Sequence, residues 1–273
     1  MRCSCTLSGM RKTYATDLSD EEWAYLRARL PELLKTVRMR AHALRDVFDA
    51  IFYVLRSGCP WRMLPGDFPP WSTVYYHFRR FRLLSGLWHR AFAILRAAER
   101  KRVGKYPDAS TAILDSQSMK TTEEGAGSNG YDAHKNLKGR KRPLLVDTLG
   151  LPLSVYVTPA DVQDRAGARL LLAGLGPLMP RLKKIWADGA YSGKELAKWC
   201  EEQGGWELEV VERDREAKGF EVLPKRWIVE RTFGWLRRDR RLTKDYERKA
   251  QTSETLIEVA MIRLMLRRLA RAA

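Results

Sequence analysis

The sequence is poor in the residues that hold zinc or carry out covalent hydrolysis. Its 273 residues include only four cysteines and four histidines. Cys3 and Cys5 form a close pair, but Cys59 and Cys200 supply no second pair to complete a tetrahedral zinc site. No convincing Ser–His–Asp or Cys–His set is present, which disfavours a covalent hydrolase. We expect reduced thiols, which fit a cytoplasmic protein.

A secretory leader and a membrane-spanning run are also missing. The first residues have no apolar core of the kind that a signal peptide needs. The longest apolar stretch lies near the C-terminus and is interrupted by Glu258, Arg263 and Arg267. The sequence therefore predicts no membrane-spanning helix.

Acidic residues are too few to balance the basic ones. The chain has 33 Asp and Glu residues against 50 Lys and Arg residues, which gives a formal net charge of +17. An excess of this size usually has a polyanionic partner. Nucleic acid fits better than a membrane surface, because the basic residues accompany buried-type apolar positions and do not form one exposed amphipathic helix. With 45% hydrophobic residues, the chain has enough apolar side chains to form a core.

The N-terminal part of the chain has helical periodicity. Ser19 and Glu22 have the spacing of a capping box. Helices are predicted over residues 20–30, 43–57, 72–83 and 87–102. Residues 1–17 show no periodic pattern and are predicted to be mobile. The pattern indicates an all-α, helix-turn-helix-like domain over residues 18–105, followed by a Pro- and Gly-containing boundary.

The pattern changes after this boundary to an alternation of strands and helices. Strands are predicted over residues 111–115, 144–148, 153–157 and 207–212, with a further strand ending at 188. Helices are predicted over residues 164–175, 193–203, 225–241 and 253–271. Residues 121–142 are Gly-rich and then basic, and they are predicted to form a long mobile loop. The alternation predicts a mixed α/β domain over residues 106–273.

Two aspartates directly follow apolar, strand-like runs. Asp115 ends the run Thr-Ala-Ile-Leu-Asp, and Asp188 ends Lys-Ile-Trp-Ala-Asp. Side chains at strand ends emerge at the rim of a sheet, where catalytic ligands of α/β proteins gather. Small or polar residues follow each aspartate and permit close approach of a metal and a phosphate. Taken singly, each is better explained as an ordinary turn or helix-cap residue.

A third carboxylate, Glu230, lies in an arginine-rich helical stretch. At 100° per residue it shares a narrow stripe with Arg226, Arg237 and Arg241, beside an apolar face. A surface Glu–Arg ladder would explain this helix but not the two upstream aspartates. Three carboxylates from separate elements suit Mg²⁺, with Mn²⁺ as a substitute, and two such ions support phosphodiester chemistry. Arg226 and Arg237 are suited to bidentate contacts with phosphate.

Several motifs closely resemble bacterial insertion-sequence transposases of the IS5 family. The matching segments are residues 18–23, 56–65, 113–120, 138–142, 146–150, 162–165, 187–191, 225–237 and 240–247. They span nearly the whole chain in order. The resemblance implies a ribonuclease-H-like catalytic domain, in which a mixed sheet is flanked by helices. It also implies an Asp-Asp-Glu triad formed by Asp115, Asp188 and Glu230.

A Tyr-Arg-Glu-Lys pattern seen among such transposases matches only in part. Arg226 and Glu230 stand at the Arg and Glu positions. Leu223 replaces the tyrosine, and Arg237 replaces the lysine while keeping a cation. The metal-binding part of the pattern is therefore complete.

Candidate DNA contacts fall in three regions. In the predicted third helix, Arg79 and Arg80 accompany aromatic residues, as in a recognition helix, although the aromatics also suit a core and the arginines solvent. The basic run of the predicted loop and the stripe beside Glu230 are expected to contact the DNA backbone. The residues of these two regions are Lys138, Arg140, Lys141 and Arg142, and Arg226, Arg237 and Arg241.

The resemblance implies a DNA transposase. Such an enzyme binds the terminal inverted repeats of an element in double-stranded DNA, cleaves at the element ends and joins the 3′-hydroxyl to target DNA. Two ends require a homodimer or larger assembly on DNA. We expect a bacterial cytoplasmic location, associated with the nucleoid when DNA is bound. A metal-dependent nuclease of the same fold and an inactive DNA-binding regulator remain the alternatives.

Overall fold

The structure is a computed structural model that describes residues 11–30, 42–83, 86–123, 128–211 and 225–272. Cys3, Cys5 and Leu223 lie outside the described residues, as do residues 124–127 of the Gly-rich run. Among the helices that are described, none is both long and apolar enough to cross a lipid bilayer.

Local sequence signals set the first helices. They are α1 (Asp20–Arg29), α3 (Leu44–Ser57), α4 (Trp71–Leu83) and α5 (Leu87–Arg102), which confirms the four predicted helices. At the start of α1, Ser19 Oγ accepts a hydrogen bond from the Glu22 amide and the Glu22 carboxylate accepts one from the Ser19 amide. This is the predicted capping box.

Residues 11–17, which were assigned to a mobile terminus, make specific contacts with the helices. The Arg11 guanidinium donates hydrogen bonds to Asp17 and to the buried carboxylate of Asp49 on α3. The Tyr14 ring stacks on Phe68 with 4.9 Å between ring centroids. Side-chain contacts therefore hold residues 11–17 against the helices. Such contacts leave no periodic pattern in the sequence.

A mixed sheet forms the middle of the molecule. Its strands are β1 (Thr111–Lys120), β2 (Gly130–Asp132), β3 (Leu137–Asp147), β4 (Pro152–Val155), β5 (Thr158–Pro159), β6 (Lys184–Ala187) and β7 (Glu207–Val210). The strand order is β2-β3-β1-β6-β7, and β4 and β5 also pair with β3. β1 runs antiparallel to β3 and parallel to β6, which in turn is parallel to β7.

The prediction of a mobile loop over residues 121–142 was wrong for much of its length. β2 and the first half of β3 lie within it, and β1 continues to Lys120, five residues beyond its predicted end. β1 and β3 pair continuously from Ala112 opposite Asp147 to Lys120 opposite Gly139. The basic composition resembles a loop, but long-range pairing and buried charge contacts hold these residues in the sheet.

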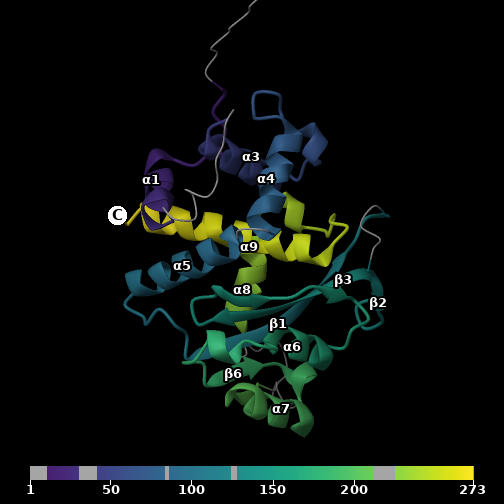
Figure 1. The fold of residues 1–273 in the computed structure, drawn as a ribbon. Helices are drawn as coiled ribbons and strands as arrows, with labels where there is room; N and C mark the ends of the chain where they lie inside the picture. The colour runs from purple at the N-terminus through teal and green to yellow at the C-terminus, as the bar shows by residue number, and fades with distance from the viewer. Residues whose placement is uncertain (1–10, 31–41, 84–85, 124–127, 212–224, 273) are drawn as a thin grey trace, which may run out of the picture.

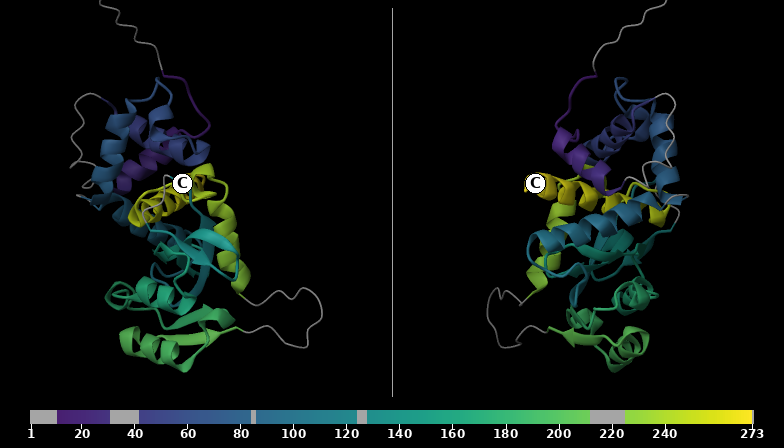
Figure 2. Two further views of the ribbon diagram at one scale, coloured as in Figure 1. Left: turned by 90° about the vertical axis from the view of Figure 1, so that its right-hand side faces the viewer. Right: turned by 60° about the vertical axis from the view of Figure 1, so that its left-hand side comes forward.

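Helices cover both faces of the sheet (Figures 1 and 2). On one face lie α6 (Asp164–Leu172) and α7 (Lys194–Gly204), and on the other lie α8 (Arg226–Leu236), α9 (Ala250–Ala270) and the N-terminal helices. Successive residues of β1 point to opposite faces of the sheet. Ile113 belongs to one apolar core, whereas Ala112 and Leu114 belong to the other. This arrangement confirms the expected α/β class, with helices flanking a mixed sheet after an N-terminal helical region.

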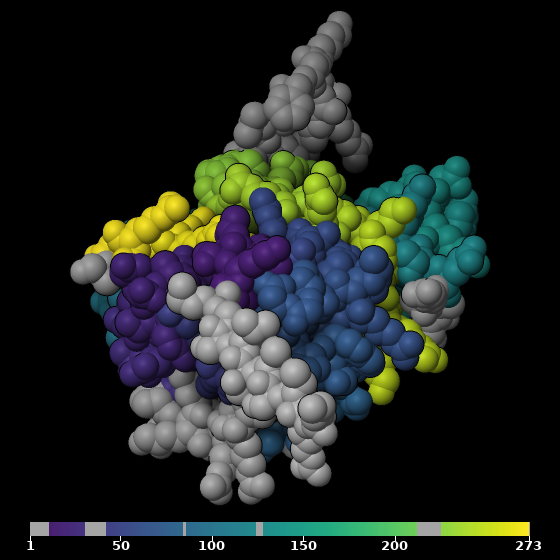
Figure 3. Space-filling view, turned by 90° about the horizontal axis from the view of Figure 1, so that it is seen from above, coloured from purple at the N-terminus to yellow at the C-terminus, as the bar shows by residue number. Residues whose placement is uncertain are grey.

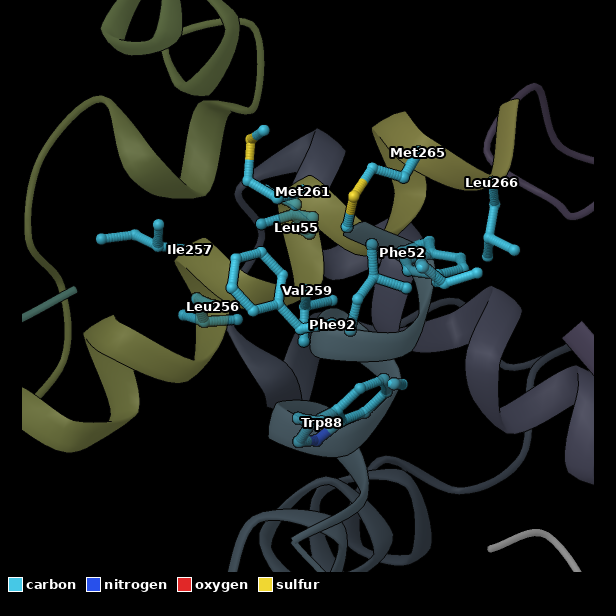
Figure 4. Packing of buried hydrophobic residues seen from close by; sticks show 14 of the residues in the cluster. Phe52, Leu55, Trp88, Phe92, Leu256, Ile257, Val259, Met261, Met265 and Leu266 are labelled. Carbon is cyan, nitrogen blue, oxygen red and sulfur yellow. The ribbon is translucent and has the colours of Figure 1, made fainter. Parts of the chain in front are cut away.

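The C-terminal helix α9 packs among the N-terminal helices. It contacts α1, α3 and α5, and its residues Leu256, Val259 and Met265 share one buried cluster with Phe52 and Trp88 (Figure 4). From above, α1, α3 and α4 form much of the visible face, with α9 at its edge (Figure 3). The predicted boundary near residue 105 therefore does not divide the apolar core, which includes parts of both predicted domains.

Candidate active site

Strand register brings Asp115 and Asp188 together. The last paired residues of the parallel strands β1 and β6 are Ile113 and Trp186, so each aspartate comes two residues after the same rung of the ladder. Asp188 directly follows β6, as predicted, whereas Asp115 lies in the middle of β1, because β1 continues along β3. Neighbouring parallel strands with equal offsets present both carboxylates on the same side.

Apolar and polar contacts fix helix α8 across these strands. Val229 and Leu236 are buried, and α8 packs against β1 and β3. Thr232 Oγ1 donates a 2.7 Å hydrogen bond to the Gly150 carbonyl in the β3–β4 turn. At the start of the helix, the Lys225 ammonium lies 3.4 Å from the centroid of the Trp186 ring on β6. These contacts place Glu230, one turn into α8, near Asp115 in the middle of β1 and Asp188 at the end of β6.

The three predicted carboxylates converge on one guanidinium group. Arg226 Nη2 lies 3.9 Å from Asp115 Oδ2, 3.4 Å from Asp188 Oδ2 and 3.9 Å from Glu230 Oε1. We call Asp115, Asp188 and Glu230 the carboxylate cage. Its members differ in exposure, with side-chain accessibilities of 15%, 24% and 60% respectively. The cage thus opens toward solvent on the side of α8.

Backbone amides orient the two aspartates of the cage. Asp115 Oδ1 accepts a 2.7 Å hydrogen bond from the Ser116 amide, and Asp188 Oδ1 accepts a 3.0 Å bond from the Ala190 amide. Asp188 therefore caps a short 3-10 helix in addition to facing the cage. Burial raises the pKa of Asp115 to about 6, and the nearby Asp188 charge adds to the rise, while the Ser116 amide and Arg226 oppose it.

A second group of polar residues lies next to Asp115 on the α6 side. Ser116 Oγ donates a 2.6 Å hydrogen bond to Asp164 Oδ1, and the Lys141 ammonium lies 3.3 Å from the same oxygen. Tyr191 is buried beside them. Its burial, followed by the charges of Asp115 and Asp164, holds the pKa of its hydroxyl well above the ordinary value. Sequence reasoning assigned no role to Asp164 or Tyr191, although both lie in segments that resemble the transposases.

A cleft of about 680 Å³ runs along this side of the aspartates. Asp115, Asp188 and Tyr191 line it, together with the cations Lys135 and Arg165. The cleft therefore carries the two aspartates and positive charge on one concave surface. Such a surface suits a phosphate chain near a metal.

The cage suits a hard divalent cation in its chemistry. Carboxylate oxygens are the preferred ligands of Mg²⁺, and all three already face one cationic group. As the side chains stand, the described parts of the chain contain no group of three His, Cys, Asp or Glu residues close enough to hold a metal ion. Asp115, Asp188 and Glu230 would have to draw inward from the spacing that Arg226 sets.

The structure brings some of the predicted DNA contacts to the surface. Arg237 is exposed at the end of α8, Lys138 is exposed on β3, and Arg79 is exposed on α4, with Arg80 partly exposed beside it. Arg226 lies partly buried at the cage. The predicted stripe through Arg241 is interrupted, because α8 ends at Leu236.

Four other predicted DNA contacts have their charged groups inside the protein. Arg140 is fully buried, pairs with Asp245 at 3.3 Å and donates to the carbonyls of Glu247 and Arg248. Arg142, also buried, donates to the Leu242 carbonyl. The buried side chains of Lys141 and Arg241 pair with Asp164 and Glu247 respectively. Because these cations serve internal partners, we do not retain them as DNA contacts.

Comparison with known proteins gives one consistent result. Residues 106–265, more than half of the chain, match the family described as the transposase DDE domain. Residues 18–92 match a family described as putative transposase of the IS4/5 family. The chain is also similar to a putative transposase for insertion sequence element IS402 of Burkholderia cepacia, with 28% identity over 171 residues that cover 58% of this chain and 78% of the relative.

Proposed function

The chain belongs to the DDE transposases, and from this premise we propose that it mobilises an insertion sequence of the IS5 family. It binds the terminal inverted repeats, hydrolyses a phosphodiester bond at each element end and joins the freed 3′-hydroxyl to target DNA. Transposases of this family act on DNA and use divalent metal. We propose Mg²⁺ as the ion, with Mn²⁺ as a substitute in vitro.

One observation carries the assignment of the catalytic residues. Asp115 and Asp188 from neighbouring strands and Glu230 from α8 all lie within 4 Å of the same nitrogen. Three carboxylates face a single guanidinium, so the cluster keeps a net negative charge that a divalent cation would offset. We assign Asp115 and Asp188 as metal ligands and Glu230 as the residue that completes the site.

The metal, the backbone amides and the arginines of the site have different roles in the reaction. Divalent metal, when bound, activates the attacking oxygen and stabilises the leaving oxygen of an in-line displacement. The Ser116 and Ala190 amides keep the two aspartates turned toward the cage. Arg226 and Arg237 hold phosphates of the cleaved strand by bidentate hydrogen bonds. A water molecule attacks the phosphorus and the bond to the 3′ oxygen breaks, which leaves a 3′-hydroxyl on one strand and a 5′-phosphate on the other. This 3′-hydroxyl then attacks a target phosphate, and the bond from that phosphorus to the 3′ oxygen of the target strand breaks, which releases a 3′-hydroxyl on the target.

Binding of the repeats is assigned to the N-terminal helical region. On α4, the exposed Trp71 and Tyr76 lie near Arg79 and Arg80 and line one hollow with Arg62. An exposed surface with basic and aromatic side chains supports a DNA-facing role for this helix. A homodimer or larger assembly holds the two element ends, and the reaction takes place on chromosomal DNA in the bacterial cytoplasm.

The test uses the gene with its flanking DNA as substrate. Purified protein is incubated with this DNA, a target plasmid and Mg²⁺, and cut positions and joined products are mapped by sequencing. We expect two defined cuts that flank the gene and joined molecules that contain an element end in the plasmid. Both products should disappear when the metal is chelated.

The alternatives give different products in the same reaction. Defined cuts without joined molecules, including from a pre-cut end, would indicate a metal-dependent nuclease. Retention of the flanking DNA in a gel without any cut would indicate an inactive DNA-binding regulator. Either result would contradict the proposed strand transfer.

A further inference from the structure

Arg226 holds its place at the carboxylate cage by charge more than by directed hydrogen bonds. Its shortest carboxylate contact is 3.4 Å, longer than an ordinary N–H···O bond. Its buried Nε atom has no hydrogen-bond partner among the described residues. A guanidinium group gains much more from short, paired bonds to one oxyanion. The present contacts therefore neutralise the cage without using the hydrogen-bonding capacity of the side chain.

Arg226 and a divalent cation compete for the same place. Metal ligation requires the carboxylate oxygens at about 2.0–2.1 Å from Mg²⁺, whereas a guanidinium among them keeps the oxygens farther apart. Two cations held by the same few oxygens also repel each other strongly in a partly buried site. The guanidinium must leave before the three carboxylates can close around a metal.

A DNA phosphate is the group best suited to remove it. Phosphate oxygens accept the bidentate hydrogen bonds that the cage does not supply, and the adjoining cleft carries Lys135 and Arg165, which attract the backbone. Arg226 lies at the N-terminal end of α8, and 27% of its side chain is exposed although its Nε atom is buried.

We propose that Arg226 couples metal binding to DNA binding. Without DNA, its guanidinium neutralises the cage and keeps the affinity for divalent metal low. When DNA binds, a backbone phosphate takes the guanidinium, and the cage becomes available to the metal. Because coupling between two ligands is reciprocal, metal also strengthens DNA binding. This inference rests on the proposed function, since it assumes that the cage binds metal and that the cleft binds DNA.

A purely supporting role for Arg226 predicts the opposite effect of its removal. If the guanidinium only holds the carboxylates together, its loss lets them repel one another and weakens metal binding. In a third case, the loss of any nearby positive charge changes the affinity of the cage for metal. Lys135 lowers the pKa of Asp115 through its charge, and among the described residues it forms no ion pair with a cage carboxylate. Lys135→Gln therefore measures the effect of charge alone.

The experiment measures Mn²⁺ affinity of the full-length protein by electron paramagnetic resonance, with and without a saturating DNA duplex from the element end. Mn²⁺ bound by the duplex alone is subtracted. In the wild-type protein we expect the duplex to tighten Mn²⁺ binding by about tenfold. Arg226→Gln should bind Mn²⁺ about tenfold more tightly than wild type without DNA and should gain little from the duplex. Lys135→Gln should need more duplex to reach saturation, because Lys135 lines the cleft, but at saturation the duplex should still tighten Mn²⁺ binding about tenfold.

Two further variants make every outcome decisive. Arg226→Lys keeps the charge but loses the paired bonds to phosphate, so it should bind Mn²⁺ weakly both with and without DNA. Asp188→Asn should lose the Mn²⁺ site. If it retains the site, the proposed function fails at the cage itself. Two results for Arg226→Gln would overturn only the coupling, provided that Asp188→Asn loses the site. The first is Mn²⁺ binding no tighter than that of Lys135→Gln, and the second is an unchanged response to DNA.

Discussion

Asp188→Asn is expected to lower Mg²⁺-dependent cleavage by about 10³-fold or more, because several kcal/mol of charge stabilisation at the reacting phosphate depend on a metal ligand. Asp188 Oδ2 faces Arg226 in the cage, while Oδ1 caps the following turn. An asparagine keeps an oxygen for the cap but removes the negative charge. The fold and the DNA-binding surface should therefore persist.

Cleavage and DNA retention are measured on the same preparations. The variant should retain element-end DNA in a gel almost as well as the wild-type protein. Glu195→Gln is a matched control, because it also removes one carboxylate charge, but from an exposed position on α7 outside the cleft. Equal cleavage by wild type and Asp188→Asn would contradict the catalytic assignment.

Arg140→Met is expected to destabilise the protein by about 3–5 kcal/mol, the usual cost of removing one partner of a buried ion pair. Arg140 lies on β3, and its side chain is fully buried against the segment before α9. Its loss leaves the Asp245 carboxylate without its cation, and the carbonyls of Glu247 and Arg248 without their donor. Although Ser253 still donates to Asp245, a hydroxyl does not replace a positive charge.

Denaturant unfolding of Arg140→Met and Lys138→Met separates a structural from a DNA-binding role. Lys138 lies on the same strand two residues earlier, but it is exposed. Its replacement should change the free energy of unfolding by no more than about 0.5 kcal/mol. Wild-type stability of Arg140→Met, with weakened DNA binding, would restore the original prediction that this arginine contacts the DNA backbone.

Asp188 and Arg140 show which features of the site could be predicted from the sequence. Asp188 was identified because an apolar run ends there, which is a local signal. The burial of Arg140 was not foreseen, because its partners Asp245, Glu247 and Arg248 lie more than 100 residues away in the chain. A basic run is normally solvated, and only the fold shows that this one pairs with buried acceptors.

The same distinction explains the secondary structure. The helix α1 begins at a capping box, and α3 has periodic apolar positions and ends at Gly58; the structure confirms both helices. The extension of β1 and most of β3 depend on pairing with each other, so their sequences gave only part of each strand. The packing of α9 among the N-terminal helices is likewise a tertiary contact without a local signal.

The cage itself was only partly foreseeable. Asp115, Asp188 and Glu230 were named from the sequence, and their side chains all face Arg226. Sequence reasoning assigned a phosphate-binding role to Arg226, but its contact with all three carboxylates follows from the register of β1 with β6 and the docking of α8. The support from Ser116, Asp164 and Tyr191 also needs the packing of α6 against the sheet.

Anomalous diffraction from a crystal of the protein with element-end DNA and Mn²⁺ tests the carboxylate cage most directly. We expect a manganese peak bonded to oxygens of Asp115 and Asp188, at roughly the 2.0–2.1 Å typical of small divalent ions, with Glu230 turned toward it and Arg226 on a phosphate. A peak held by other residues, or Asp115 and Asp188 both without metal in a DNA-bound complex that contains Mn²⁺, would contradict this account.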